Sequence, residues 1–457
     1  MKIDKNIENS IATLKKKLAA DENFDVVYRT IKIASRDACL FFIDGYVKDE
    51  IMEKLMEFFE SIEDSECVSD AHTFAQGFTP YVEVGLDDDV DTLVTQVLSG
   101  VSILLVDGFT KAVAIDARTY PQRATSEPDK DKVLRGSKDG FVETLIFNTA
   151  LLRRRIRDPA LRVIHYQIGR ESKTDVALCY LNGRADEALL KKTKEKLKTM
   201  DIRALTMNQE TLAEALVHHK WYNPFPKFKY TERPDTTAAQ VLEGDIVLLV
   251  DNSPSALIMP VTLFDVMEEA NDYYFPPITG TYLRLTRFLV TFLTMILTPT
   301  WLLLLTYPDA IPEWLEFIKI TDKIHVPIVA QLLILEFAID GLKLASLNTP
   351  SMLTTSLSMI GAIVVGDFAV KSGWFCAQSM LYMALVAIAN YAQPGYELSY
   401  ALKFMRLILL ALTGLFGVWG YIAGHAAIIL ILVTNKTVAG TSYLYPLIPF
   451  NAKEFKK

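Results

Sequence analysis

The sequence predicts a multi-domain fold in which two related α/β modules precede an all-α polytopic transmembrane domain of five or six spans. The first observation behind this prediction is an uneven distribution of charge. Residues 281–457 hold 21 of the 102 charged residues, about 12% of that segment, whereas about 29% of residues 1–280 are charged. So little charge over so long a segment is typical of membrane helices, and residues 1–280 have the composition of a water-soluble protein.

The second observation is an internal duplication within residues 1–280. The stretch QVLSGVSILLVDGFTKAVAI from Gln96 aligns without a gap with QVLEGDIVLLVDNSPSALIM from Gln240, and LFFIDGYVKDEIMEKLMEFFESI from Leu40 resembles LCYLNGRADEALLKKTKEKLKTM from Leu178. Each copy reads as a β-rich run, a Gly turn, an amphipathic helix and then a hairpin. We therefore expect α/β modules in residues 1–125 and 126–280 and a transmembrane domain in residues 281–457.

Charge and motifs exclude several classes of function. Residues 1–280 carry a net charge of −11, so we expect no nucleic-acid partner. No apolar leader precedes this region, which predicts that it stays in the cytoplasm. The four cysteines have no CxxC spacing, and the region contains no P-loop, GxGxxG, HExxH or GxSxG motif. We therefore predict no enzyme activity, no cofactor and no metal site.

Apolar runs in residues 281–457 indicate the membrane spans. Four runs are clear, and they cover residues 287–307, 326–345, 351–370 and 374–392. The last run, residues 404–434, contains Gly414, Gly417, Gly420 and Gly424 and is longer than one span needs. It forms either one tilted helix, giving five spans, or two short halves, giving six.

Two carboxylates lie within the second run. Glu336 and Asp340 are four residues apart, so a helix places both on one face, and an ionised carboxylate facing lipid is costly. They must face protein, water or an ion. Either they pair with Lys343 or Arg406 or lie near the inner interface, or they line a cation pathway. Asp367, close to Lys371 at the end of the third run, has the same two interpretations.

The third run carries a stripe of small and weakly polar residues. Thr354 and Ser358 repeat at four-residue spacing and are followed by Ala362 and Val365. Such a stripe favours close helix packing, the commoner use of small residues in membranes. It also fits a narrow pore that closes by dewetting at an apolar constriction.

A basic cluster lies in the second module. The stretch TALLRRRIRDPALRV places Arg153, Arg154, Arg155 and Arg157 close together. One interpretation is an amphipathic helix whose arginines pair with acidic neighbours or contact another subunit, and the other is a site for anionic lipid headgroups.

Longer motifs resemble a known family. The stretches RGSKDGFVETLIFNTALLRRRIRDP, SKTDVAL, NPFPKFKYTERPD and YLYPLIPFN are similar to those of the GerA family of spore germination proteins, in particular its A-type subunits. GDFAV, LYMA, YELS and the IPFN ending resemble the stage V sporulation protein AF branch of that family. The resemblance covers nearly the whole chain from about residue 25.

The resemblance implies a multi-pass protein of the spore inner membrane, with its N-terminal region on the core side. It also implies a ring of identical subunits that conducts monovalent cations during germination, and a small membrane protein or other receptor subunits as partners. Within TERPD, it suggests that Pro234 sets a turn and that Asp235 caps the following helix. For Glu232 and Arg233 the resemblance allows three roles, which are an ion pair, a subunit contact or a ligand site.

Three hypotheses for function follow. The first is an oligomeric cation channel whose α/β modules assemble or gate the ring. The second is a non-conducting scaffold or signal-relay subunit of a germinant receptor complex. The third is a secondary transporter, for which the membrane region offers no inverted repeat.

Overall fold

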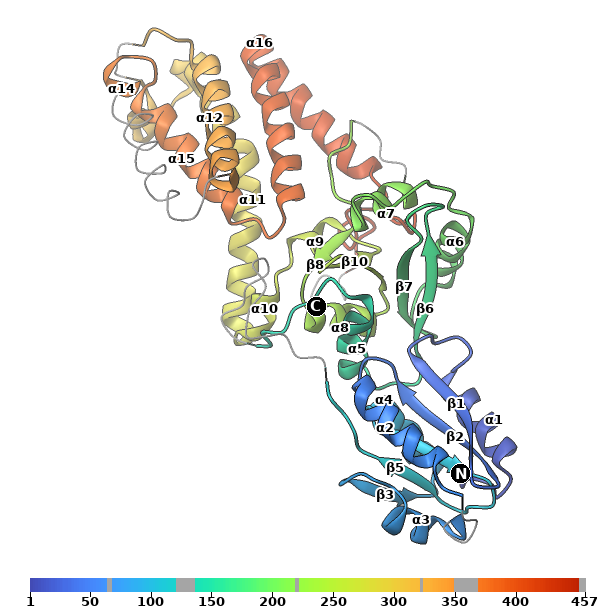
Figure 1. The fold of residues 1–457 in the computed structure, drawn as a ribbon. Helices are drawn as coiled ribbons and strands as arrows, with labels where there is room; N and C mark the ends of the chain where they lie inside the picture. The colour runs from blue at the N-terminus through green and yellow to red at the C-terminus, as the bar shows by residue number, and fades with distance from the viewer. Residues whose placement is uncertain (64–67, 121–135, 218–221, 321–323, 349–368, 452–457) are drawn as a thin grey trace. The chain divides into compact units, whose positions relative to one another are not determined.

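The computed structural model describes residues 1–63, 68–120, 136–217, 222–320, 324–348 and 369–451. These residues form two compact units. One comprises residues 1–217 and 228–260, and the other comprises residues 222–227 and 261–451. The first unit is α/β and the second is helical (Figure 1).

The first unit contains two five-stranded antiparallel sheets of the same topology. Their strand orders are β1-β2-β4-β5-β3 and β6-β7-β9-β10-β8. The strands of the first sheet are β1 (Val26–Ile33), β2 (Arg36–Ile43), β3 (Val84–Asp87), β4 (Ser102–Val106) and β5 (Ala112–Ile115). Those of the second are β6 (Leu161–Ile168), β7 (Thr174–Leu181), β8 (Lys229–Thr231), β9 (Ile246–Val250) and β10 (Ala256–Met259). The hairpin predicted after each Leu-Leu-Val-Asp motif is therefore confirmed.

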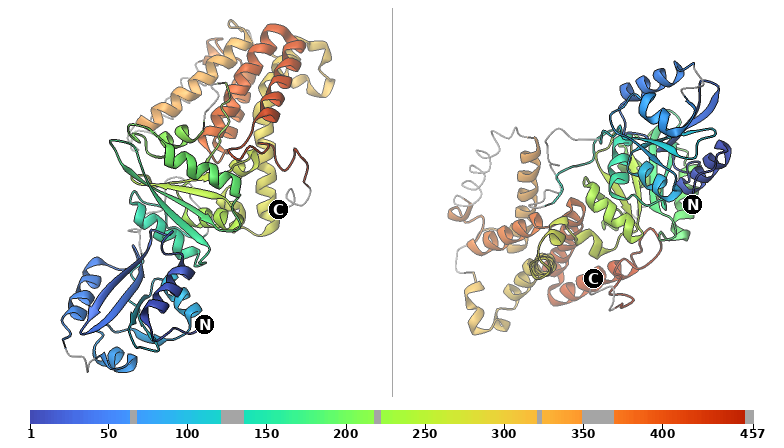
Figure 2. Two further views of the ribbon diagram at one scale, coloured as in Figure 1. Left: turned by 90° about the vertical axis from the view of Figure 1, so that its right-hand side faces the viewer. Right: turned by 90° about the horizontal axis from the view of Figure 1, so that it is seen from below.

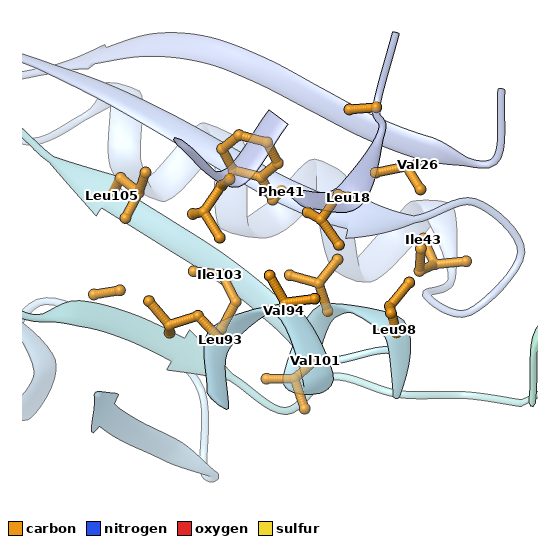
Figure 3. Close-up of a cluster of buried hydrophobic side chains, with 14 of the residues drawn as sticks. Leu18, Val26, Phe41, Ile43, Leu93, Val94, Leu98, Val101, Ile103 and Leu105 are labelled. Carbon is orange, nitrogen blue, oxygen red and sulfur yellow. The ribbon is translucent and has the colours of Figure 1, made fainter. Parts of the chain in front are cut away.

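Helices cover both faces of the first sheet (Figure 2). The first module contains α1 (Ile7–Leu18), α2 (Asp49–Glu60), α3 (Ala71–Gly77) and α4 (Val90–Leu98). Side chains of α1 and α4 pack with Phe41, Ile43 and Ile103, as Figure 3 shows, whereas α2 and α3 pack with Leu40 and Leu104 on the opposite face. Because both faces are covered, β4 is buried along its whole length and its sequence is continuously apolar after Ser102.

The second module repeats this plan. Its helices are α5 (Leu145–Arg155), α6 (Glu187–Thr199), α7 (Gln209–Leu216) and α8 (Pro234–Glu243). The agreement extends to single hydrogen bonds. The Ile7 N–H at the start of α1 donates to Asp107 Oδ1, 3.2 Å away, and the Leu145 N–H at the start of α5 donates to Asp251 Oδ1, 3.0 Å away. The predicted duplication is confirmed, and it includes a first helix that the alignment of the two sequences did not reveal.

The second unit is built from helices. It contains α9 (Leu263–Met267), α10 (Ala270–Tyr274), α11 (Pro277–Thr306), the 3-10 turns η2 (Pro308–Ala310) and η3 (Glu313–Ile318), α12 (Ile328–Asn348), α14 (Ala369–Lys371), α15 (Ala377–Tyr391) and α16 (Tyr396–Thr434). Within the described residues, α11 and α16 are long and apolar enough to cross a membrane. The third predicted span lies mostly outside the described residues, so the count of five or six spans stays a prediction.

The helix α16 is a hairpin of two helices. Gly417 interrupts it with φ 57° and ψ −131°, a conformation that favours glycine. A methyl group built on Gly420 would lie 1.9 Å from the Leu412 carbonyl oxygen, and one on Gly424 would lie 2.5 Å from Leu409. Residues eight and fifteen positions apart are in contact only because the chain reverses (Figure 1). The last predicted run is therefore two helical segments, and whether they make one span or two stays a prediction.

Two segments that the sequence analysis placed in the second module pack in the helical unit instead. Val261 and Met267 lie in one buried apolar cluster with Leu398 and Tyr443, and Phe225 of the NPFPKF stretch joins it. The Asn223 side-chain amide donates to Asn435 Oδ1, 2.9 Å away, after the end of α16. The extended NPFPKF stretch is thus anchored to the C-terminal segment of this unit.

A buried charge network and an ion pair between the modules

The two carboxylates of α12 face another helix of the helical unit. Glu336 is 1% exposed and forms two parallel contacts with Arg406 of α16, Oε1 to Nε at 2.5 Å and Oε2 to Nη2 at 3.0 Å. The Arg406 side chain is fully buried, and its Nη1 also donates to the Thr294 carbonyl of α11 at 3.2 Å. This planar pairing satisfies both carboxylate oxygens, so the charge of Glu336 is compensated within the protein.

Asp340 is paired one turn further along α12. The Lys403 ammonium group contacts Asp340 Oδ2, lies 3.6 Å from Glu336 Oε2 and donates to the Glu336 carbonyl at 2.9 Å. The other carboxylate oxygen of Asp340, Oδ1, is buried and has no hydrogen-bond partner in the described part of the chain. The network thus contains two carboxylates and two cations, and one acidic oxygen remains available.

Both carboxylates thus face protein groups, and Arg406, one of the two expected partners, pairs with Glu336. Lys343, the other expected partner, lies over the rings of Tyr391 and Tyr400, at 5.1 and 5.6 Å. Lys403 was not among the expected partners, so its contact with Asp340 is a finding of the structure. A useful signal was its spacing: Lys403 and Arg406 are three residues apart on one helix, matching the four-residue spacing of the carboxylates.

The remaining candidates for the ion pathway lie outside the described residues. These are Thr354, Ser358, Ala362, Val365 and Asp367. Their assignment to a pore-lining stripe stays a prediction.

The basic cluster of the second module does not act as one patch. Arg153 is fully buried and holds Asp25 of the first module, with Nε to Oδ2 at 2.9 Å and Nη2 to Oδ1 at 3.0 Å. Arg154 is exposed and lies 4.4 Å from the ring centre of Tyr120. Arg153 is therefore a contact between modules within one chain.

The other two arginines of the cluster point elsewhere. Arg155 binds both carboxylate oxygens of Asp139, at 2.6 and 2.7 Å. Arg157 lies exposed beyond the end of α5. The four arginines thus have four different environments, and an assembly role for each stays a proposal.

Electrostatics reinforce the contact between the modules. Burial alone would lower the pKa of the Arg153 guanidinium, but the adjacent Asp25 carboxylate outweighs burial, so the pKa is raised and the guanidinium stays protonated. Burial also raises the pKa of the Tyr46 hydroxyl far above its usual value. That hydroxyl remains protonated and donates to the Ala150 carbonyl of α5 at 3.1 Å.

The TERPD stretch forms an ion pair inside the second module. Arg233 is fully buried, binds both oxygens of Asp235 at 3.1 and 2.5 Å, and donates to the Ser137 carbonyl at 3.0 Å. The Glu232 carbonyl accepts from the Phe141 N–H at 2.8 Å. The expectation that Asp235 caps the helix is wrong. Pro234 occupies the first position of α8, whose N-cap is Arg233, so Asp235 lies within the first turn.

Comparison with known proteins places this architecture in a family. The model of the family described as Bacillus/Clostridium GerA spore germination protein matches residues 12–457. The chain is 37% identical over 440 residues to stage V sporulation protein AF of Bacillus subtilis (strain 168), covering 96% of this chain and 89% of that protein. It is 30% identical over 439 residues to the uncharacterized membrane protein YfkQ of the same organism, covering 94% of this chain and 84% of that protein.

Receptor subunits also match. Spore germination protein KA of Bacillus subtilis (strain 168) is 27% identical over 463 residues, covering 99% of this chain and 84% of that protein. Among solved structures, the N-terminal domain of the A subunit of the Bacillus megaterium spore germinant receptor GerK3 matches with a TM-score of 0.43 and 27% identity, covering 57% of this chain and 96% of that domain. Because the family model matches from residue 12 to the last residue, this chain belongs to the GerA family of spore germination proteins.

Proposed function

We propose that the protein is an oligomeric channel subunit of the spore inner membrane that passes monovalent cations in germination, or amplifies that response. Its five or six spans would form the pathway, and its α/β modules, on the core side, would assemble or gate a ring of identical subunits. The names of the relatives, which include spore germination proteins and a sporulation protein, support the setting. A small membrane protein or other receptor subunits would be its partners.

One observation carries the channel proposal. Asp340 keeps an acidic oxygen, Oδ1, without a hydrogen-bond partner among the described residues, although its other oxygen is held by Lys403. Acidic side chains placed along a membrane helix and turned away from lipid are the usual means of attracting cations into a pathway. The stripe Thr354, Ser358, Ala362 and Val365, with Asp367 at its end, would line the adjoining segment.

A second function is favoured by a different observation. The four charges of the network sum to zero and three of the four side chains are at least 95% buried, which is also the arrangement of a purely structural ion network. A non-conducting scaffold or signal-relay subunit of a germinant receptor complex would need nothing more from these residues.

Cation flux distinguishes the two functions. We would measure flux through liposomes containing the purified full-length chain, with and without a candidate small membrane partner, after confirming insertion. The channel predicts flux well above empty liposomes, reduced by Asp340→Asn and altered by bulky residues at Thr354 or Ser358. The matched control is Asp309→Asn, which removes an exposed carboxylate between α11 and α12. Absence of flux in both conditions would favour the scaffold.

A further inference from the structure

The contact between the two modules is a specific docking surface. Ala150 of α5 is fully buried in the apolar core of the first module, next to Tyr46 and Leu98. A methyl group built on Gly45 would lie 3.3 Å from the Ala150 methyl carbon. Together with the Arg153 to Asp25 pair, these contacts show that one face of α5 receives the end of the first module that contains residues 22–25 and 44–46.

The duplication provides a second copy of each partner surface. The Asp44 N–H donates to the Asp25 carbonyl, and the Asn182 N–H donates to the Ala160 carbonyl, both at 2.9 Å. The following turns also match, because Gly45 and Gly183 both have φ 82°. One end of the second module contains residues 158–160 and 182–184. This end is therefore the structural counterpart of the end of the first module that docks on α5.

The helix α1 is the counterpart of α5. The hydrogen bonds that begin the two helices align Ile7 with Leu145. In this alignment, the counterparts of Ile146, Ala150, Arg153 and Arg154 are Glu8, Ala12, Lys15 and Lys16, in that order. Whereas Ala150 is fully buried, Ala12 is exposed. A depression of about 540 Å³ lies along this face of α1, lined by Glu8, Ile11, Ala12, Lys15, Lys16 and Asp21. Each chain thus has one α-helical docking face that is filled and one that is open.

The charges of the two open surfaces are complementary. The α1 face carries Glu8 at the position of Ile146, and the end of the second module carries Arg184 at the position of Tyr46. Within the chain the equivalent positions lie close together, since a methyl group built on Gly45, next to Tyr46, would lie 3.0 Å from the Ile146 side chain. Both Glu8 and Arg184 are exposed. The apolar and buried contact inside the chain is replaced by surface charges of opposite sign, as at the rim of an interface between separate chains.

We propose that the exposed end of the second module, residues 158–160 and 182–184, binds the α1 face of a second copy of this chain. This contact would repeat, between chains, the contact that joins the two modules within one chain. It is head-to-tail, so each copy uses both surfaces, and such contacts build rings when the rotation between copies closes. The inference deepens the proposed function, because it names the surfaces that would assemble the oligomer.

Three contacts that join the modules within a chain are missing between chains, so the contact between chains is weaker. The counterparts of Asp25 and Tyr46 are Ala160 and Arg184, so neither the buried ion pair nor the hydroxyl hydrogen bond is repeated. The Phe24 N–H of the first module donates to the Val163 carbonyl of β6 at 3.2 Å. The counterpart of Phe24 is Pro159, which has no N–H, so this hydrogen bond is missing between copies. Association therefore depends on the high local concentration that a membrane provides.

Cysteine cross-linking tests the proposal. The full-length chain would be prepared in membranes with Cys67→Ser, and with Ala12→Cys and Gly183→Cys. These two positions are the counterparts of Ala150 and Gly45, whose methyl positions are 3.3 Å apart. Such a separation is close to the Cβ separation of a disulfide. The other three cysteines are buried. We expect mild oxidation to give a ladder of dimers and larger species on a denaturing gel, removed by reductant.

Matched controls identify the contact. Each single variant alone should give no ladder, but the two single variants with different tags, expressed together, should give a mixed dimer. Lys54→Cys with Gly183→Cys carries the same number of thiols, one of them on the exposed side of α2, and should give background only. If the Ala12 and Gly183 pair gives no more than this control, the proposed contact is wrong.

Charge reversal gives an independent readout. Glu8→Arg or Arg184→Glu alone should reduce the yield of the ladder, and the two together should restore it, since the pair regains opposite charges. An amine-reactive cross-linker on the chain without added cysteines reports whether any oligomer forms. Oligomers without the disulfide ladder would overturn this contact and leave the channel proposal standing, whereas absence of both would count against the ring itself.

Discussion

At the scale of single residues, the central finding is how the carboxylates of α12 are compensated. Glu336 is held by the Nε and Nη2 groups of Arg406, and Asp340 is held by Lys403. Removing one member of such a buried pair leaves an uncompensated charge, which costs far more than removing both. The pairing therefore determines which substitutions this unit tolerates.

We expect Arg406→Met to destabilise the helical unit by about 3–5 kcal/mol, because Glu336 is then buried without a partner. The double variant Arg406→Met with Glu336→Gln should recover most of that loss. The measurement is the temperature at which the detergent-solubilised chain loses its monodisperse elution peak.

The control for this prediction is Lys319→Met. Lys319 pairs with Glu316 at 2.9 Å on the surface, where both side chains are more than a third exposed. Such exposed pairs contribute about 0–1 kcal/mol, so the melting temperature should hardly change. Equal effects of Lys319→Met and Arg406→Met would contradict the structural role of the network.

At the scale of elements, the hairpin of α16 depends on glycines at its reversal and its crossing. The two halves come so close at Gly420 that a side chain there meets the backbone of Leu412. Small residues permit such close approach between helices in membranes.

We expect Gly420→Ala to destabilise the chain by about 1–3 kcal/mol or more, because the backbone contact with Leu412 cannot relax without opening the hairpin. The matched control is Gly341→Ala in α12, where nothing lies within 4 Å of the added methyl group. Alanine is favoured over glycine in a helix by about 1 kcal/mol, so this control should be neutral or stabilising. A neutral Gly420→Ala in the same thermal assay would rule out the tight hairpin.

At the scale of the whole molecule, the two α/β modules form one compact unit. The buried Arg153 to Asp25 pair, the Tyr46 hydroxyl on Ala150 and the Phe24 N–H on β6 all join the first module to the second. We therefore expect the two modules to unfold together.

We expect Arg153→Met to separate the unfolding of the modules into two transitions and to cost about 3–5 kcal/mol, because Asp25 remains buried and unpaired. The signal is far-ultraviolet circular dichroism during urea unfolding of the full chain, since no tryptophan lies in residues 1–217 or 228–260, which form the two modules. The control is Arg154→Met, which removes an exposed contact with the Tyr120 ring that contributes about 0.5–1 kcal/mol. A single, unchanged transition in Arg153→Met would show that the pair does not couple the modules.

The sequence by itself determined the features that repeat along the chain. The division into α/β and helical parts follows from charge density, the duplication from aligned stretches such as those at Gln96 and Gln240, and the family from long motifs. The hairpins could be predicted because apolar strands separated by a short polar turn are a local pattern. The direction in which Glu336 and Asp340 face could also be predicted, because lipid excludes their charge.

Only the tertiary structure decided which groups meet. Arg153 and Arg154 are adjacent and chemically identical, yet one is buried against Asp25, 128 positions away, and the other is exposed. The sequence left α16 as one helix or two, and the close approach of Gly420 to Leu412 selected two. Pairing between distant residues depends on how helices and sheets pack, and no local pattern encodes it. The sequence therefore specified the elements and their chemistry, and packing decided the partners.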